Sequence, residues 1–283
     1  MRERVHQQKK QLYTYFATRF QEIEEEAATQ NEHQPGAAKK LIGLVVLASL
    51  CMTVVKYFGP RYKTKLPFEA VSTLWPGAMD LHHTLFTNHD FSMLAKNAYW
   101  SLSILVFYGV LPYCYVRWVK PQASSVDLGL STAGALQHWR IYLTFYLVMV
   151  VMMIFISDVE AFQKYYPFYK GAGKNLTHFF AWELIYLPTF LAVEFFFRGV
   201  LIFPFSKRFG AYSVLIPIMP YCMIHFGKPI QETLGAIAAG LLLGALALAT
   251  RSIWLGVAIH VSVALTMDVL SLWRKGTLPF LSW

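Results

Sequence analysis

Long apolar runs alternate with short polar stretches along most of the chain. The runs lie at about 41–59, 98–118, 140–157, 177–204, 211–226, 234–249 and 253–273. A helix needs about 20 residues to cross the hydrocarbon core of a bilayer, and most of these runs reach that length. The unbroken runs differ from the alternating pattern of an outer-membrane barrel. The pattern therefore predicts an all-α fold, a polytopic membrane helix bundle of about seven transmembrane helices.

Two neighbouring runs, 211–226 and 234–249, are shorter than a full crossing. Short apolar segments are tilted, re-entrant or packed inside the bundle away from lipid. Counts of six or eight spans therefore stay open. In the second run, Gly240 and Gly244 share one helix face with Ala236. Small residues at this spacing let two helices approach closely, which predicts a packing face.

Residues 1–40 are polar, but apolar side chains recur in them at helical spacing. These side chains are Leu12, Phe16, Phe20 and Ile23. The spacing is typical of an amphipathic helix that lies on a membrane surface. A solvated tail fits the same residues equally well.

The amino-acid composition supports a membrane protein and indicates which class of partner it binds. The chain is 56% hydrophobic and 14% charged, with a formal net charge of +9. Soluble domains are about 25% charged, so this chain keeps much of its surface out of water. The basic residues are spread over many loops without an aromatic-interleaved stripe, which indicates membrane lipids with anionic headgroups as partners and no nucleic acid. We expect a multi-pass protein of the cell membrane.

The stretch "AVEFFFRGVL" (192–201) places two charges inside an apolar run. A charge at the centre of a membrane helix costs about 2.5–3.5 kcal/mol on insertion scales, so such residues are candidates for function. Glu194 and Arg198 are four residues apart, which puts both side chains on one face of an α-helix. Pro188 precedes them and predicts a bend in the helix. The pair is either a structural clamp or part of a reaction centre.

Two histidines in later apolar runs extend this polar set. His225 stands beside the break "HFGKP", Glu232 follows it by seven residues, and His260 lies inside the last run. A single buried histidine is usually a hydrogen-bonded core residue. A carboxylate with two imidazoles can activate water by general-base catalysis, or the three can bind Zn²⁺. If a metal is bound, its ligands are expected to be His225, His260 and Glu194.

Two further acidic residues lie in the same runs but away from this set. Glu183 is eleven residues before Glu194, and Asp268 is eight residues after His260. At 1.5 Å of rise per residue these spacings correspond to roughly 16 Å and 12 Å along a helix. Glu183 therefore cannot share the reaction centre of Glu194.

Three short motifs in the C-terminal half resemble one family. "VEFFFRG" (193–199), "YCMIH" (221–225) and "HVSVA" (260–264) are similar, in order and spacing, to the EExxxR, FxxxH and HxxxN motifs of the CAAX protease and bacteriocin-processing (CPBP) family, which includes the type II CAAX prenyl proteases. The resemblance covers about residues 175–273. It departs at Val193, where the family has its first glutamate, and at Ala264, where the family has asparagine.

The apolar pattern, together with the resemblance over about residues 175–273, predicts a division of the chain into four parts. Residues 1–40 form the polar N-terminal tail, 41–174 the N-terminal membrane helices with a cap loop, 175–273 the CPBP-like catalytic helix core, and 274–283 the C-terminal tail. Because the family consists of intramembrane endopeptidases, the expected substrates are membrane-anchored or lipidated protein tails, or small peptides.

Catalysis is then expected from five residues. These are Glu194, Arg198, His225, Glu232 and His260. Water is activated by Glu232 or Glu194 with His225, Glu232 being the substitute for the glutamate missing at Val193. His260 stabilises the oxyanion or donates a proton, and Arg198 holds Glu194. No cofactor is required in this reading, with Zn²⁺ as the alternative.

Two other functions fit parts of the pattern. A non-catalytic CPBP-like membrane scaffold or a toxin-immunity protein explains the losses at Val193 and Ala264. An ion or proton transporter also uses buried charges, but it needs a continuous polar path through the bilayer. The runs at 41–59 and 140–157 carry charge only near their ends, which disfavours a transporter.

Overall fold

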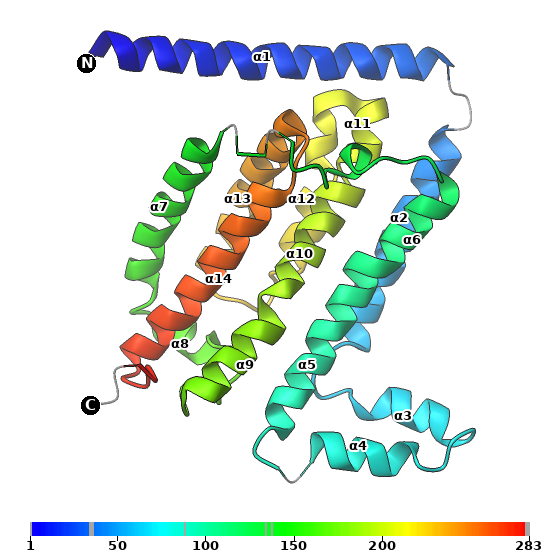
Figure 1. The fold of residues 1–283 in the computed structure, drawn as a ribbon, viewed down its shortest axis with the longest axis vertical. Coiled ribbons are helices and arrows are strands. Elements are labelled where there is room, and N and C mark those ends of the chain that lie inside the picture. Colours follow the sequence, from blue (N-terminus) through cyan, green and yellow to red (C-terminus); the bar gives the residue numbers. More distant parts are fainter. Residues whose placement is uncertain (1, 34–36, 88, 134, 137, 281–283) are drawn as a thin grey trace. The chain divides into compact units, whose positions relative to one another are not determined.

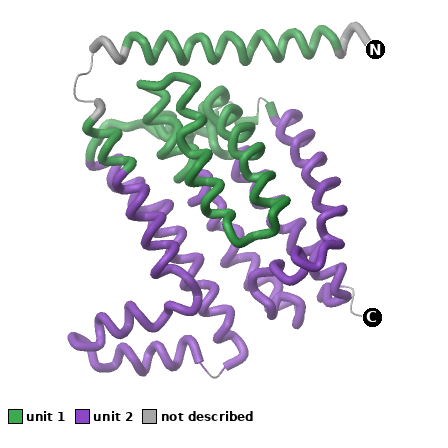
Figure 2. Tube along the Cα trace, turned by 180° about the vertical axis from the view of Figure 1, so that it is seen from behind, with its two compact units in different colours: residues 1–45, 119–138, 195–254 green, residues 46–118, 139–194, 255–283 purple. Residues whose placement is uncertain are grey.

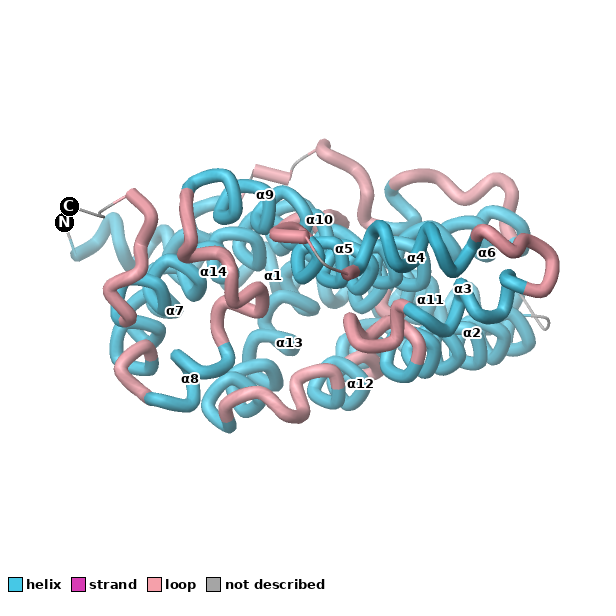
Figure 3. Tube along the Cα trace, turned by 90° about the horizontal axis from the view of Figure 1, so that it is seen from below, coloured by secondary structure: helices cyan, strands magenta, loops and turns pink. Residues whose placement is uncertain are grey.

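The structure, a computed structural model, describes residues 2–33, 37–87, 89–133, 135–136 and 138–280. These residues form helices and loops without a strand, apart from one isolated antiparallel bridge between Leu130 and Ser252 (Figures 1 and 3). The all-α prediction is confirmed. Parts of the expected terminal tails, residues 1, 34–36 and 281–283, lie outside the described residues.

Within the described ranges, six helical stretches are long and apolar enough to cross a membrane. They are Lys39–Tyr57, Ser92–Val119, Trp139–Ile156, Leu176–Leu215, Ile230–Thr250 and Trp254–Arg274. The count is six where the pattern predicted about seven, and the difference arises at 211–226. This run is divided between the end of the fourth stretch and a short helix, α12 (Ile218–Met223). Pro217, which lacks the N–H group that a continuous helix needs, lies at the break just before α12 and explains the interruption.

The chain divides into two compact units, coloured separately in Figure 2. Unit 1 comprises Met1–Val45, Val119–His138 and Phe195–Trp254. Unit 2 comprises Val46–Trp118, Trp139–Glu194 and Leu255–Trp283. The α-helix α2 (Ala37–Tyr57) runs from the first segment of unit 1 into unit 2.

Unit 1 contains a long N-terminal helix and the elements between residues 126 and 250. They are α1 (Arg2–His33), η2 (Val126–Leu128), η3 (Phe195–Val200), α11 (Phe203–Phe209), η4 (Gly210–Leu215), α12 and α13 (Ile230–Thr250). Helix α1 packs on this unit through Ile23, which is buried with Ile202, Val214 and Leu248. Glu26 pairs with Arg251 beside this contact, at 2.7 Å. The apolar spacing near residue 20 therefore marks a face that packs on protein.

The small-residue face of α13 packs as its spacing predicted. A methyl group on Gly240 would lie 3.2 Å from atoms of Ile218 and Tyr221, and one on Gly244 would lie 3.0 Å from Val214. These contacts bring α12 and η4 close to the backbone of α13. Residues 218–225 are held in place by this packing.

Unit 2 contains most of the helices before residue 195 and the last helix. They are α3 (Lys65–Ser72), α4 (Ala78–Phe86), α5 (Ser92–Ile104), η1 (Leu105–Val110), α6 (Leu111–Val119), α7 (Trp139–Ile156), α8 (Glu160–Tyr165), α9 (Leu176–Tyr186), α10 (Pro188–Glu194) and α14 (Trp254–Arg274). Helix α9 begins at the cap residue Asn175, whose side chain accepts from the His178 N–H at 3.0 Å. Its α-helical geometry is interrupted at Leu187, just before Pro188, as the proline predicts.

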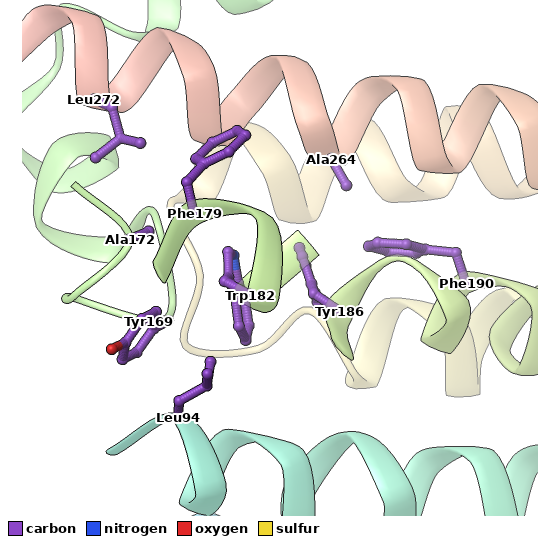
Figure 4. Packing of buried hydrophobic residues seen from close by; sticks show 9 residues of the cluster. All are labelled: Leu94, Tyr169, Ala172, Phe179, Trp182, Tyr186, Phe190, Ala264 and Leu272. Carbon is purple, nitrogen blue, oxygen red and sulfur yellow. The ribbon is translucent and has the colours of Figure 1, made fainter. Parts of the chain in front are cut away.

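An aromatic cluster joins α9 and α10 to α14 inside unit 2. Its buried members include Trp182, Tyr186 and Phe190 on the first segment and Ala264 and Leu272 on α14 (Figure 4). Burying large aromatic side chains contributes about 1.5–3 kcal/mol each. The cluster therefore fixes α14 against the helix that ends at Glu194.

Candidate active site

Glu194 meets His260 inside unit 2. Glu194 is the last residue of α10 and is 1% exposed, and its Oε1 atom lies 2.9 Å from Nδ1 of His260 on α14. Gly256, one helical turn before His260, permits this approach, because an added methyl group there would lie 2.9 Å from Glu194 Oε2. The Phe190 ring packs on the imidazole, with the ring centroids 4.5 Å apart. The structure thus brings two of the predicted residues into direct contact, and their catalytic roles stay predictions.

This contact defines which nitrogen of His260 accepts a hydrogen bond. When Glu194 is ionised its carboxylate can only accept hydrogen bonds, and in that state Nδ1 of His260 carries the proton and donates it to Glu194. In the neutral ring, Nε2 is then the basic nitrogen. The side chain of His260 is 16% exposed, whereas that of Glu194 is 1% exposed. The pair therefore combines a buried carboxylate with a more accessible proton acceptor.

The two positions where the family motif is lost are apolar and buried. Val193 is 8% exposed, and Ala264 is 4% exposed within the aromatic cluster of unit 2 (Figure 4). Neither side chain can accept a proton or donate a hydrogen bond. Any reaction in this chain must therefore proceed without the two groups that the family motif carries there.

Arg198 is held in unit 1 by an aromatic ring. It lies in the π-helix η3, is 1% exposed, and places its guanidinium carbon 4.4 Å from the centroid of the Tyr221 ring. Phe197 packs on the same ring at 5.1 Å. A desolvated cation–π contact of this kind contributes about 2 kcal/mol or more. The role of Arg198 as the partner of Glu194 stays a prediction.

His225 is oriented by the same tyrosine through its backbone. Its Nδ1 atom lies 2.8 Å from the carbonyl oxygen of Tyr221, which can only accept, so Nδ1 carries the proton. The ring is buried and packs edge-on against Tyr221, with the centroids 4.8 Å apart. In the neutral ring Nε2 is again the acceptor, which suits His225 to taking up a proton.

Glu232 forms an ion pair across the first turn of α13. Its Oε1 atom accepts from Lys228 Nζ at 2.5 Å, and both side chains are about one-fifth exposed. The turn that ends just before Lys228 contains Gly227, whose φ of +92° is a left-handed conformation that glycine adopts without strain. The role of Glu232 as the substitute base stays a prediction, and Lys228 is its observed partner.

A zinc site would need three or more donor side chains close together. Across the described part of the chain, no group of three or more His, Cys, Asp or Glu side chains is placed to hold a metal ion. The zinc alternative, with His225, His260 and Glu194 as ligands, stays a prediction.

Sequence reasoning missed the residues that orient the two imidazoles. The Tyr221 carbonyl lies four residues before His225, a spacing at which a helical histidine can reach back to the backbone, so this signal was available. The close approach at Gly256 and the packing of Phe190 on His260 depend on which helices are neighbours, and the sequence gives no direct sign of that.

Comparison with known proteins identifies the C-terminal half. Residues 175–266 match the family model described as Type II CAAX prenyl endopeptidase Rce1-like. All five predicted site residues and both departures fall inside this range. The search found no matching curated protein, and it found no matching solved structure. The family resemblance drawn from the three motifs is confirmed.

Proposed function

Because residues 175–266 are an Rce1-like type II CAAX prenyl endopeptidase domain, we propose that this multi-pass membrane protein hydrolyses peptide bonds in polypeptides anchored to the membrane. The expected substrates are lipidated or membrane-anchored protein tails, or small peptides. The contact between Glu194 and His260 carries the proposal, since a buried carboxylate that orients an imidazole is an arrangement used for general-base catalysis.

In the proposed reaction His260 is the base. Its Nε2 atom takes a proton from water while the water oxygen bonds to the carbonyl carbon of the substrate. Glu194 stabilises the imidazolium through the hydrogen bond at Nδ1, an interaction strengthened by the low exposure of the carboxylate. Collapse of the tetrahedral intermediate breaks the C–N bond, and His260 returns the proton to the leaving amine. The products are one carboxylate and one amine terminus.

In this proposal His260 activates the water, a role that the sequence analysis assigned to Glu232 or Glu194 together with His225. The 2.9 Å contact supports the change, because Glu194 already orients an imidazole and Glu232 is engaged by Lys228. The catalytic role of His225, whose Nδ1 atom faces the Tyr221 carbonyl, stays a prediction.

A second candidate function is favoured by the departures from the family motif. Val193 and Ala264 are buried apolar residues at positions where the family has a glutamate and an asparagine. A scaffold that binds a polypeptide tail without cleaving it, including a toxin-immunity protein, needs neither group.

Cleavage by the purified protein distinguishes the two candidates. The full chain is reconstituted in liposomes with farnesylated and transmembrane-anchored peptides that become fluorescent on cleavage. We expect His260→Ala and Glu194→Gln to reduce cleavage by about 10²-fold or more, the usual contribution of a general base. His83→Ala, at an exposed histidine of α4, is the matched control and should cleave like the wild type. Saturable peptide binding without cleavage would favour the scaffold.

A further inference from the structure

A second pair of titratable side chains lies between the same two helical segments as Glu194 and His260. Glu183 on α9 is 5% exposed, and Asp268 on α14 is 0% exposed. The two carboxyl groups interact electrostatically with each other. Their sequence spacing from Glu194 and His260 placed both outside the predicted reaction centre, and the fold brings them together in unit 2.

The pair has few hydrogen-bond donors. Trp182 donates from Nε1 to Oδ2 of Asp268 at 2.6 Å. Among the described residues no donor reaches Oδ1 of Asp268 or either oxygen of Glu183. Three buried carboxyl oxygens are therefore left without a protein donor. An unsatisfied buried polar group costs about 1–3 kcal/mol, and more if it is charged.

The neighbouring cations do not bond to the pair. Lys170 and Lys275 interact with Asp268 through their charges only. Lys275 donates to the Tyr166 carbonyl, and Lys170 donates to the Lys164 carbonyl at 2.6 Å.

Arg61 interacts through its charge with Lys170, one of these two lysines. It donates to the Phe168 carbonyl at 2.6 Å and to Oδ1 of Asn97 at 3.2 Å. Its hydrogen bonds, like those of the two lysines, go to groups other than the carboxyl pair.

Two adjacent carboxylates with this burial cannot both be ionised without a large penalty. Removing one ion from water costs several kcal/mol, and like charges at one site raise that cost further. A shared proton removes one charge and supplies the missing donor at the same time. We propose that Glu183 and Asp268 form a proton-binding site, in which protonated Glu183 donates a hydrogen bond to ionised Asp268.

Three observations place the proton on Glu183. The Trp182 N–H donates to Asp268, which stabilises the ionised form of the acceptor. The charges of Lys170 and Lys275 act on Asp268 in the same direction. Glu183 has no described donor that would stabilise its anion.

The shared proton joins α9 to α14 through a hydrogen bond inside the aromatic cluster. Trp182, which donates to Asp268, belongs to that cluster, and so does Leu272 one turn after Asp268 (Figure 4). The proposal stands on this geometry and does not depend on peptide cleavage.

Infrared spectroscopy of the purified full-length protein in lipid tests the proposal. A protonated carboxylic acid gives a C=O band that shifts in D₂O and is distinct from carboxylate bands. The wild type minus Glu183→Gln difference spectrum at neutral pH should show the loss of one acid band. Glu69→Gln, at an exposed glutamate paired with Lys65, should leave that band unchanged. Loss of carboxylate bands in Glu183→Gln, or no change of the acid band, overturns the proposal.

Unfolding at different pH values gives a second readout. Glu183→Gln should remain folded, since its amide replaces the donating O–H. Near neutral pH the folded wild type retains a proton that the unfolded chain releases, so its folding equilibrium should weaken by about tenfold for each pH unit gained. In Glu183→Gln this pH dependence of the folding equilibrium near neutral pH should be absent, and in Glu69→Gln it should be unchanged. Equal pH dependence in all three proteins contradicts a bound proton.

Discussion

Ala264→Asn introduces the side chain that the family motif carries at this position, and we expect it to destabilise the protein. Ala264 is 4% exposed among buried aromatic side chains that include Tyr186 and Phe190. The larger side chain overpacks this cluster at about 1–3 kcal/mol. An amide buried there without partners adds about 1–3 kcal/mol. The free energy of unfolding should therefore fall by about 2–6 kcal/mol.

Unfolding in mixed detergent, followed by tryptophan fluorescence, measures this loss. Ala133→Asn, at an exposed loop residue, is the matched control and should change the free energy of unfolding by about 0.5 kcal/mol or less. If Ala264→Asn is as stable as the wild type and cleaves peptides faster, the position has room for a catalytic amide. The apolar packing would then have been misjudged, and with it the observation that favours the scaffold.

The remaining predictions concern unit 1 and one exposed carboxylate. Arg198→Ala should lower the thermal unfolding midpoint more than His260→Ala does, because it removes a buried cation–π contact of about 2 kcal/mol. Equal midpoints for the two variants would contradict a stabilising role of this contact. Gly129→Ala should cost about 2–4 kcal/mol of unfolding free energy in the same assay, since φ is +69° and the added methyl group would lie 2.3 Å from Phe203; wild-type stability would refute this. Hydrogen bonds from Lys174 and then His178 lower the pKa of Asp90, so the stability that these contacts provide is present above the ordinary pKa of an aspartate and is lost as the pH falls below it. Asp90→Asn should remove that acid-side loss in thermal unfolding, and an unchanged pH profile would contradict the assignment.

The fold class and most spans could be predicted, because the cost of burying backbone in lipid leaves few alternatives. Whether the run at 211–226 forms one membrane-spanning helix was harder to predict, because hydropathy records how apolar a segment is and not whether its helix is continuous. Pro217 carried that information, because the helix is interrupted at this residue, just before α12. The π-helix η3 (Phe195–Val200), which holds Arg198, left no sign in the apolar pattern.

The candidate site could be predicted as a set of residues but not as a geometry. Motif order identified Glu194 and His260, and the structure places them in contact. Spacing along one helix predicts that Glu183 and Glu194 are far apart, but it gave no indication that Asp268 interacts with Glu183 from another helix. Contacts between helices depend on packing partners such as Trp182, which a sequence read one segment at a time does not reveal.

In the proposed reaction, Glu194 and His260 activate water for peptide-bond cleavage. The most direct measurement is mass spectrometry of the products formed in ¹⁸O-labelled water by the purified protein in liposomes with a membrane-anchored peptide. The account predicts one ¹⁸O atom in each newly formed carboxyl terminus, with product formation reduced by about 10²-fold or more in Glu194→Gln and in His260→Ala. Labelled product that forms at the wild-type rate in both variants, or no product from any membrane-anchored peptide, would contradict it.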